Sequence, residues 1–242
     1  MKARILGVGG YENSGLAGNA FIIDGTILCE APPDILQSLA REGLQLGDLE
    51  AVFLSHSHGD HIFGMPFLLF NLAKSKRRSE RLKIIGPPDI QGFVHRLIDF
   101  SIHKGHPLND WVEANCAFEI ADEGRRLDLG DYAFEFYRTA HEKETYGFGL
   151  RSGGELKLQY IPDTRWDESL RPVFMAGSRV ILCDVNGTGG NNKIHLSAAE
   201  IEANLPAFDF RRTRIYGTHL ARDLGRRAGR ILIARPGMTI RS

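Results

Sequence analysis

The segment that most constrains this chain is AVFLSHSHGDHIFG, in which an apolar run leads directly into four side chains able to bind a metal. The run Ala51–Leu54 has the length and composition of a buried β-strand. Four polar residues follow it at short intervals: His56, His58, Asp60 and His61. Neutral imidazole and carboxylate are ligands that Zn²⁺ accepts, so this spacing indicates a metal centre at the end of a strand.

Small residues separate these ligands from one another. Ser57 and Gly59 let the first two imidazoles reach one ion without a clash of the backbone between them. Asp60 and His61 come where we expect the chain to turn, and they can serve a second ion. A lone histidine is most often an ordinary core or surface residue, but three histidines and an aspartate at this spacing are not explained in that way.

The hexapeptide HSHGDH, residues 56–61, resembles the His-x-His-x-Asp-His signature of the metallo-β-lactamase superfamily. In that family a lone histidine, an aspartate and a final histidine come after three later strands. The chain contains all three in that order: His141, Asp163 and His219. The closing segment ILIARPGMTIRS is also similar to the last strand pair and turn of the family, so the resemblance covers nearly the whole chain.

The resemblance implies two divalent metal ions, with zinc expected and manganese or iron as alternatives. One ion would be held by His56, His58 and His141. The other would be held by Asp60, His61 and His219, with Asp163 as the bridge. Two ions about 3.5–4 Å apart lower the pKa of a shared water and clamp both the attacking and the leaving oxygen. The nucleophile would then be a bridging hydroxide, with Asp60 as the catalytic side chain that supports it.

One residue departs from the family pattern. Many members carry an aspartate at the end of the second hairpin strand, whereas TILCEAPPD places Glu30 there. Carboxylates behind a metal site fix the tautomer of the ligating imidazoles. Glu30 is therefore a candidate for orienting the histidine-rich loop, and a plain solvated glutamate is the alternative.

A further histidine lies between Asp163 and His219, in the segment KIHLSAAEIEANL. Ser197 and Glu200 have the spacing of a capping box, which places His195 at the N-terminus of a helix. This arrangement resembles the His-Ser-Thr element of the tRNA-processing endonuclease RNase Z and related phosphodiesterases. There the histidine lies beside the metals and helps to stabilise the oxyanion or to protonate the leaving group.

The positive end of a helix also favours an anionic substrate. His195 is therefore a candidate catalytic residue, and a helix-flanking histidine with only local contacts is the alternative.

The size of the substrate follows from one short connection. RNase Z grips tRNA with a long arm, which would have to fit between His141 and Asp163. Only 21 residues separate them, and two strands and the turn at Gly153-Gly154 account for that length. We therefore expect a phosphodiesterase for a small or cyclic phosphodiester, such as a cyclic nucleotide or a cyclic sugar phosphate.

Other functions of the same fold stay open, because the fold does not choose between chemistries. The main alternative is a hydrolase of carboxylic esters, thioesters or lactones, of the glyoxalase-II or lactonase type. A binding scaffold without turnover is a third class. A di-iron redox role is disfavoured because His58 stands where those proteins carry a glutamate.

The numbers of acidic and basic residues indicate which binding partners to expect. Lysine plus arginine and aspartate plus glutamate each number 30, so no overall field attracts nucleic acid, and any phosphate-binding surface must be local. We expect a small, anionic substrate and no nucleic-acid partner. The sequence does not determine the oligomeric state, and a homodimer is compatible with it.

The location is expected to be cytoplasmic. MKARILGVGG lacks the pattern of a secretory signal, and charges or glycines interrupt every apolar run before the roughly 18 residues that span a bilayer. No membrane partner is therefore expected. The three cysteines, Cys29, Cys116 and Cys183, have no disulfide or zinc-knuckle spacing, and we expect reduced thiols without a catalytic role.

Strand-length apolar runs alternate with helical segments along both halves of the chain. This pattern and the resemblance predict an α/β fold, the αββα four-layer sandwich of the metallo-β-lactamase type, with residues 1–242 as one domain. The basic run Lys74–Arg81 is expected to be a solvated loop, with phosphate contact as the alternative. His95, His103 and His106 are expected at the surface, although contact with substrate phosphate or metal stays open.

Overall fold

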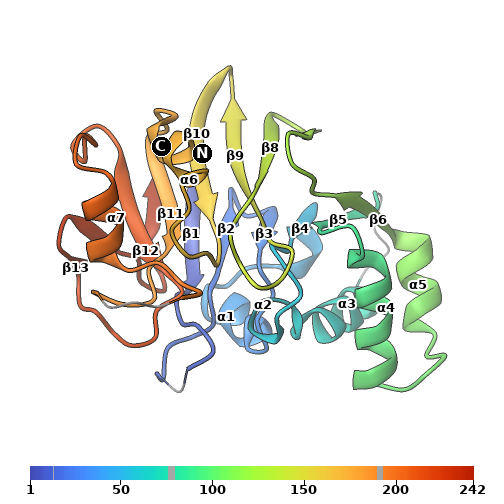
Figure 1. The fold of residues 1–242 in the computed structure, drawn as a ribbon. Helices are drawn as coiled ribbons and strands as arrows, with labels where there is room; N and C mark the ends of the chain where they lie inside the picture. Colours follow the sequence, from blue (N-terminus) through green and yellow to red (C-terminus); the bar gives the residue numbers. More distant parts are fainter. Residues whose placement is uncertain (13, 76–79, 190–192) are drawn as a thin grey trace.

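The computed structural model describes residues 1–12, 14–75, 80–189 and 193–242. Two β-sheets face each other at the centre of the molecule, and helices cover their outer faces (Figure 1). This arrangement confirms the predicted αββα sandwich.

The first sheet has the strand order β15-β1-β2-β3-β4-β5-β6. Its strands are β1 (Lys2–Gly7), β2 (Ala20–Ile23), β3 (Ile27–Cys29), β4 (Ala51–Phe53), β5 (Leu82–Gly86), β6 (Cys116–Ile120) and β15 (Thr239–Arg241). The strands from β3 to β6 are parallel, so their carboxyl ends meet at one edge. The helices that follow these strands are α1 (Ile35–Arg41), α2 (Gly59–Ile62), α3 (Met65–Lys74), α4 (Ile90–Ser101) and α5 (Leu108–Asn115), with a 3₁₀ turn at Leu46–Asp48.

The second sheet has the order β13-β14-β12-β11-β10-β9-β8-β7. Its strands are β7 (Arg126–Leu129), β8 (Tyr132–Arg138), β9 (Tyr146–Ser152), β10 (Glu155–Ile161), β11 (Val180–Asp184), β12 (Arg214–Thr218), β13 (Arg227–Ala228) and β14 (Ile231–Ile233). Helices α6 (Leu170–Met175) and α7 (Ala198–Asn204) belong to this half. The connection between His141 and Asp163 consists mainly of β9 and β10, as the sequence predicted.

Successive side chains of a strand point to opposite faces of the sheet, and in the first sheet they contribute to two apolar cores. In β2, Phe21 and Ile23 pack into the core between the sheets, whereas Ile22 packs toward the helices. The rings across the central core meet edge to face, with centroids 4.9 Å apart for Phe21 and Tyr160 and 4.8 Å apart for Phe53 and Phe148. Since successive side chains of a strand point to opposite faces, apolar strands of this kind must be covered on both sides.

Several elements were not expected from the sequence. These are the 3₁₀ turn at Leu46–Asp48, α2, α5, β6, β7 and β13. Strand β7 carries Arg126 and Asp128 on exposed positions and lies at the edge of its sheet, so it lacks the apolar run of a central strand. The three cysteines are buried and not disulfide-bonded, which agrees with the prediction of reduced thiols.

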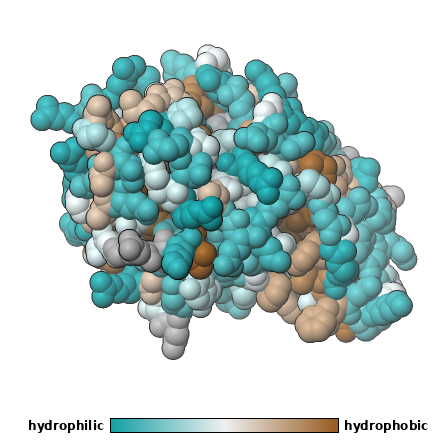
Figure 2. Space-filling model, viewed as in Figure 1, coloured by the Kyte–Doolittle hydropathy of each residue, from teal (hydrophilic) through white to brown (hydrophobic). Residues whose placement is uncertain are grey.

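The surface is mostly hydrophilic on the face in view, and its apolar residues gather toward the side on which α3 and α4 lie (Figure 2). Phe67 and Phe100, in α3 and α4, are among the exposed large apolar side chains. Among the helices that the structure describes, none combines the length and apolar composition that crossing a bilayer requires. Residues 76–79 of the basic run Lys74–Arg81 lie outside the described residues.

Gly64 positions the helical part of the metal-binding signature. Its amide donates a hydrogen bond of 2.8 Å to the carbonyl of Ala31, at the junction of α2 and α3. A Cβ atom there would lie 2.2 Å from the carbonyl oxygen of Pro32 and 2.6 Å from Cγ2 of Ile35. Only glycine therefore fits between these two segments.

We predict that Gly64→Ala lowers the free energy of unfolding by about 1–3 kcal/mol, because overpacking forces the backbone apart. The measurement is urea denaturation followed by circular dichroism. Gly47→Ala is the matched control, because no atom lies within 4 Å of a Cβ added at Gly47. Equal stability of the two variants would contradict this account of the junction.

Candidate metal centre

The HSHGDH segment leaves the carboxyl end of β4 and enters α2. His56 is completely buried in the loop, and His58 is the N-cap residue of α2, with extended backbone angles. Asp60 and His61 lie inside this short helix rather than in an irregular turn. The change from extended to helical backbone points the four side chains to two neighbouring positions.

The first cluster combines His56, His58, His141 and Asp163, whose ligand atoms all lie within 4.8 Å of one another. Nδ1 of His58 lies 3.0 Å from Nε2 of His56 and 3.2 Å from Nε2 of His141. Oδ2 of Asp163 is 3.7 Å from Nε2 of His56 and 3.8 Å from Nε2 of His141. Four donors therefore surround a space of the size that one ion needs.

The second cluster combines Asp60, His61 and His219. Oδ2 of Asp60 lies 3.6 Å from Nε2 of His61 and 3.1 Å from Nε2 of His219. The other carboxylate oxygen of Asp163, Oδ1, is 3.3 Å from Nε2 of His61 and 3.5 Å from Nε2 of His219. Each oxygen of Asp163 thus faces a different cluster, which is the geometry that a bridging ligand requires.

Several buried polar atoms in these clusters have no hydrogen-bond partner within the described chain. They are both ring nitrogens of His61, Oδ1 of Asp163, Oδ1 of Asp184 and Nδ1 of His219. Buried polar atoms almost always have a hydrogen-bond partner, so several unpartnered atoms at one place need an explanation. Divalent cations held between the two clusters would satisfy those that face the centre, and the residues therefore fit a two-metal site.

The pKa shifts of the histidines also support a metal site. Burial lowers the pKa of His56, and the neighbouring His61 adds to the effect, so this ring is neutral, as a ligand must be. Burial also opposes protonation of His61, but the charges of Asp163 and Glu30 outweigh it and raise the pKa. For His219, burial again opposes protonation, but Asp163, Asp60 and Asp184 together outweigh it and raise the pKa to about 9. The buried carboxylates therefore demand positive charge, from protons or from metal ions.

Glu30 is buried and engaged rather than solvated. Its Oε2 lies 3.3 Å from Nδ1 of His61 and accepts a 3.3 Å hydrogen bond from the amide of Ser55. Its Oε1 accepts a 3.0 Å hydrogen bond from the hydroxyl of Tyr160. Glu30 and His219 have positive φ angles of 67° and 57°, which non-glycine residues rarely adopt. Such strain concentrates at functional sites, where the surrounding structure enforces it.

His195 lies beside the second cluster. Its ring stacks on that of His219, with centroids 4.9 Å apart, and its Nδ1 is 2.9 Å from Oδ2 of Asp184. Burial lowers the pKa of His195, but the hydrogen bond and charge of Asp184 outweigh it, so the pKa is raised. The predicted cap is also present, since Oγ of Ser197 accepts a hydrogen bond from the amide of Glu200.

Asp184 was missed by the sequence reasoning. It ends β11 in the same way that Asp163 follows β10, and a carboxylate at the end of an apolar strand was the signal that could have found it. The ligand atoms of Asp163, Asp184, His195 and His219 also lie close enough together to form a third candidate cluster. His195 can therefore act as a ligand or as a proton donor, and the two roles call for a test.

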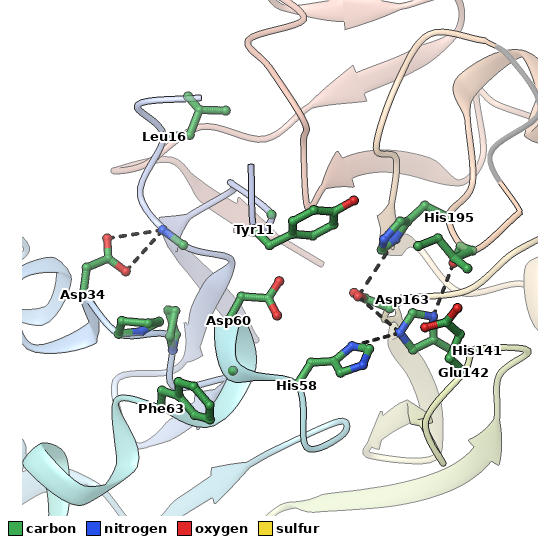
Figure 3. A pocket seen from close by; sticks show the side chains of 16 residues that line it. Tyr11, Leu16, Asp34, His58, Asp60, Phe63, His141, Glu142, Asp163 and His195 are labelled. Carbon is green, nitrogen blue, oxygen red and sulfur yellow. Dashed lines mark hydrogen bonds and ion pairs between the residues drawn. The ribbon is translucent and has the colours of Figure 1, made fainter. Parts of the chain in front are cut away.

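A pocket of about 810 Å³ opens onto both clusters. Figure 3 shows His58, Asp60, His141, Asp163 and His195 converging on it, with Tyr11 beside His195. Tyr11 and Phe63, which also line the pocket, were not identified from the sequence.

None of the three histidines at 95, 103 and 106 is among the described residues that line this pocket. His103 is exposed, and His95 and His106 are partly exposed, in agreement with the surface location expected for them. His95 contacts Asn109 and Glu113 instead.

Comparisons with known proteins agree with the fold and with the type of site. A family model described as "Anti-Pycsar protein Apyc1" matches residues 1–231. Ribonuclease Z of Staphylococcus epidermidis is 35% identical over 78 residues, which are 32% of this chain and 25% of that protein. The chain thus aligns with only a quarter of the length of this relative.

Solved structures extend the likeness to the whole chain. The metallo-β-lactamase fold protein YhfI from Bacillus subtilis has a TM-score of 0.75 and 20% identity, covering 100% of this chain and 99% of that one. A diphosphatase of the PhnP family has a TM-score of 0.71 and 17% identity, covering 100% and 97%. The metallo-β-lactamase fold and the likeness to the RNase Z branch, both inferred from the sequence, are confirmed.

We predict that the purified protein holds about two transition-metal ions per chain after growth with zinc, because two sets of ligands converge on Asp163. His219→Ala should reduce the content to about one ion, since it dismantles the second cluster. The measurement is elemental analysis without chelators. His95→Ala is the control and should keep the wild-type content. A wild-type content below about one ion would contradict the two-metal assignment.

Proposed function

The chain belongs to the Anti-Pycsar protein Apyc1 family, within the metallo-β-lactamase superfamily, and we propose that it is a two-metal hydrolase of small or cyclic phosphodiesters. The observation that carries this proposal is the pair of His/Asp clusters joined by Asp163 at the base of a pocket of about 810 Å³. We propose zinc as the metal, held by the four signature ligands together with His141, Asp163 and His219.

Divalent ions at this place would activate a water for attack and neutralise charge on the phosphate oxygens. The chain itself supplies the acid and base groups. The carboxylate of Asp60 lines the pocket, and its side chain is 18% exposed, so it can accept a proton from the attacking water as well as contact His219.

His195 is placed to donate to the substrate. Asp184 accepts the hydrogen bond of Nδ1, which orients the ring and leaves Nε2 as the nitrogen that serves the substrate. The hydrogen bond and the charge of Asp184 raise the pKa of His195. A protonated imidazole can stabilise charge on a phosphate oxygen or protonate the leaving oxygen.

Phosphodiester cleavage is favoured over ester cleavage by two observations. The hydrogen bond with Asp184 orients the His195 ring as a donor beside the clusters, where a diester transition state develops negative charge. The sequence relative named Ribonuclease Z and the structural neighbour described as a diphosphatase are also both named for the cleavage of phosphate bonds.

The pocket suits a small molecule with a flat ring. Its volume lies within the roughly 300–1,000 Å³ of ordinary small-molecule sites. Tyr11 is 64% exposed and Phe63 is 50% exposed, and in the view of Figure 3 they lie on either side of Asp60. Aromatic faces stack on nucleobases whatever their sequence. A cyclic nucleotide combines such a ring with a compact diester.

Turnover assays with the zinc-loaded protein test the reaction class. The panel is bis-p-nitrophenyl phosphate, cyclic nucleotides, S-lactoylglutathione and a lactone. We predict diester turnover, and we predict that His195→Ala lowers it by roughly 10²–10³-fold, because one donor to the transition state is lost.

The metal content of His195→Ala should stay at the wild-type value. Loss of metal together with activity would show that His195 is a metal ligand instead. Wild-type turnover by the variant would show that His195 has only a structural role. Turnover of the thioester or lactone alone would overturn the phosphodiester proposal.

We predict that Phe63→Ala raises KM for a cyclic nucleotide by about tenfold with little change in kcat, since stacking contributes about 1–3 kcal/mol per base. Phe67→Ala is the matched control, because Phe67 is also 50% exposed but lies outside the pocket lining. Steady-state kinetics of the two variants decide the matter. The same KM in both would exclude Phe63 as a wall for the substrate ring.

A further inference from the structure

A second large hollow, of about 630 Å³, lies outside the metal centre. Its charged lining residues are all arginines: Arg214, Arg226, Arg227, Arg235 and Arg241. A neighbouring hollow of about 400 Å³ shares Arg214 and adds Arg179 and Arg212. We call the two together the arginine hollow.

The arginine hollow is separate from the metal centre. Arg214 is the first residue of β12, whose other end leads to His219, so the two sites lie about 15 Å apart along the strand. Arg241 belongs to β15 near the C-terminus, and the two termini lie at the end of the sheets opposite α2 (Figure 1). The two hollows share no lining residue with the catalytic pocket.

Most arginines of the hollow have no acidic partner in the part of the chain that the structure describes. Among the described residues that line the two hollows, none carries a carboxylate side chain. Of these seven arginines, only Arg179 forms an ion pair within the described ranges, and its partner is Glu155 at 3.7 Å. Because the chain as a whole has equal numbers of acidic and basic residues, this concentration is not the result of a basic composition. Clustered like charges repel each other, and an anionic ligand would relieve the repulsion.

Two features fit a small phosphorylated ligand. Guanidinium groups bind phosphate through paired N–H donors, which arginine provides better than lysine. The hollow also has an apolar floor, to which Tyr216, Leu232 and Met238 contribute. Its volume is that of a site for a small molecule.

One arginine is already held in place. The guanidinium of Arg214 donates a 2.6 Å hydrogen bond to the carbonyl of Arg241, and it lies 6.0 Å from the ring centre of Tyr216. A side chain fixed in this way loses less entropy when a ligand binds. The floor and Arg214 therefore form a partly organised binding surface.

We propose that the arginine hollow binds a small molecule with a chain of phosphate groups, either a nucleoside polyphosphate or inorganic polyphosphate. A compact hollow with apolar lining residues favours this class over nucleic acid, which needs a continuous basic groove along its backbone. A symmetric contact between two copies centred on this surface would set arginines against arginines, which disfavours it as a dimer interface.

Binding of ATP and of tripolyphosphate to the zinc-loaded protein, by calorimetry at about 0.15 M salt, tests the proposal. The triple variant Arg226→Gln, Arg227→Gln, Arg235→Gln should weaken binding at least tenfold, since no described hydrogen bond or ion pair of these side chains is lost from the fold. The control triple Arg81→Gln, Arg96→Gln, Arg126→Gln removes the same charge elsewhere and should change the Kd by less than twofold. The arginine triple variant should keep the wild-type diester turnover, because the hollow shares no lining residue with the catalytic pocket.

Tighter binding of ATP would identify the nucleoside as part of the ligand, and tighter binding of tripolyphosphate would identify the phosphate chain alone. Three results would overturn the proposal. They are no binding of either probe, equal weakening in the two triple variants, and binding of a 20-nucleotide single-stranded RNA without binding of either small probe.

Discussion

The buried carboxylate of Asp163 is the group on which the rest of the site depends. It is only 2% exposed, and its two oxygens face two different sets of imidazoles. A buried charge is costly unless it is compensated, so the surrounding fold must keep positive charge on both sides of it. The parallel strands supply this arrangement, because the carboxyl ends of β10, β11 and β12 meet at one edge. The proposed chemistry follows from the same electrostatic demand, since ions that neutralise Asp163 also polarise a substrate.

A second layer of buried acids holds the ligands in position. Glu30 engages His61 from the first sheet, and Asp184 engages His195 from the second. Glu30 is itself held by Tyr160, 130 residues further along the chain. The positive φ angles of Glu30 and His219 show that the backbone is strained at the ligands while the sheets behind them are regular. Rigidity of this kind keeps a metal site selective in geometry and leaves specificity to the pocket walls.

The two cationic regions of the protein differ in origin. The metal centre concentrates histidines and acids from strand ends, and its positive charge would come from bound ions. The arginine hollow collects guanidinium groups from separate segments of the second half, from Arg179 to Arg241, and no acidic residue is among its described lining residues. Neither region is visible in the net charge, which is zero at pH 7. A balanced composition therefore limits only the long-range field and says little about local surfaces.

The sequence by itself determined the class of fold and indicated the candidate metal ligands, because strand periodicity and the HSHGDH spacing are local properties of the chain. It also determined the helix cap at Ser197, which placed His195 correctly beside α7. The positions of Tyr11 and Phe63 at the pocket were decided only by the tertiary structure, since neither has a distinctive local pattern. Asp184 has the local signal of a carboxylate at a strand end, but its contact with His195 also depends on the tertiary structure. The resemblance implied that Asp163 lies between the two ligand clusters. The contacts that place it there form only when the two sheets bring together residues that are distant in sequence. Packing of this kind depends on long-range contacts, and short-range patterns do not encode those contacts.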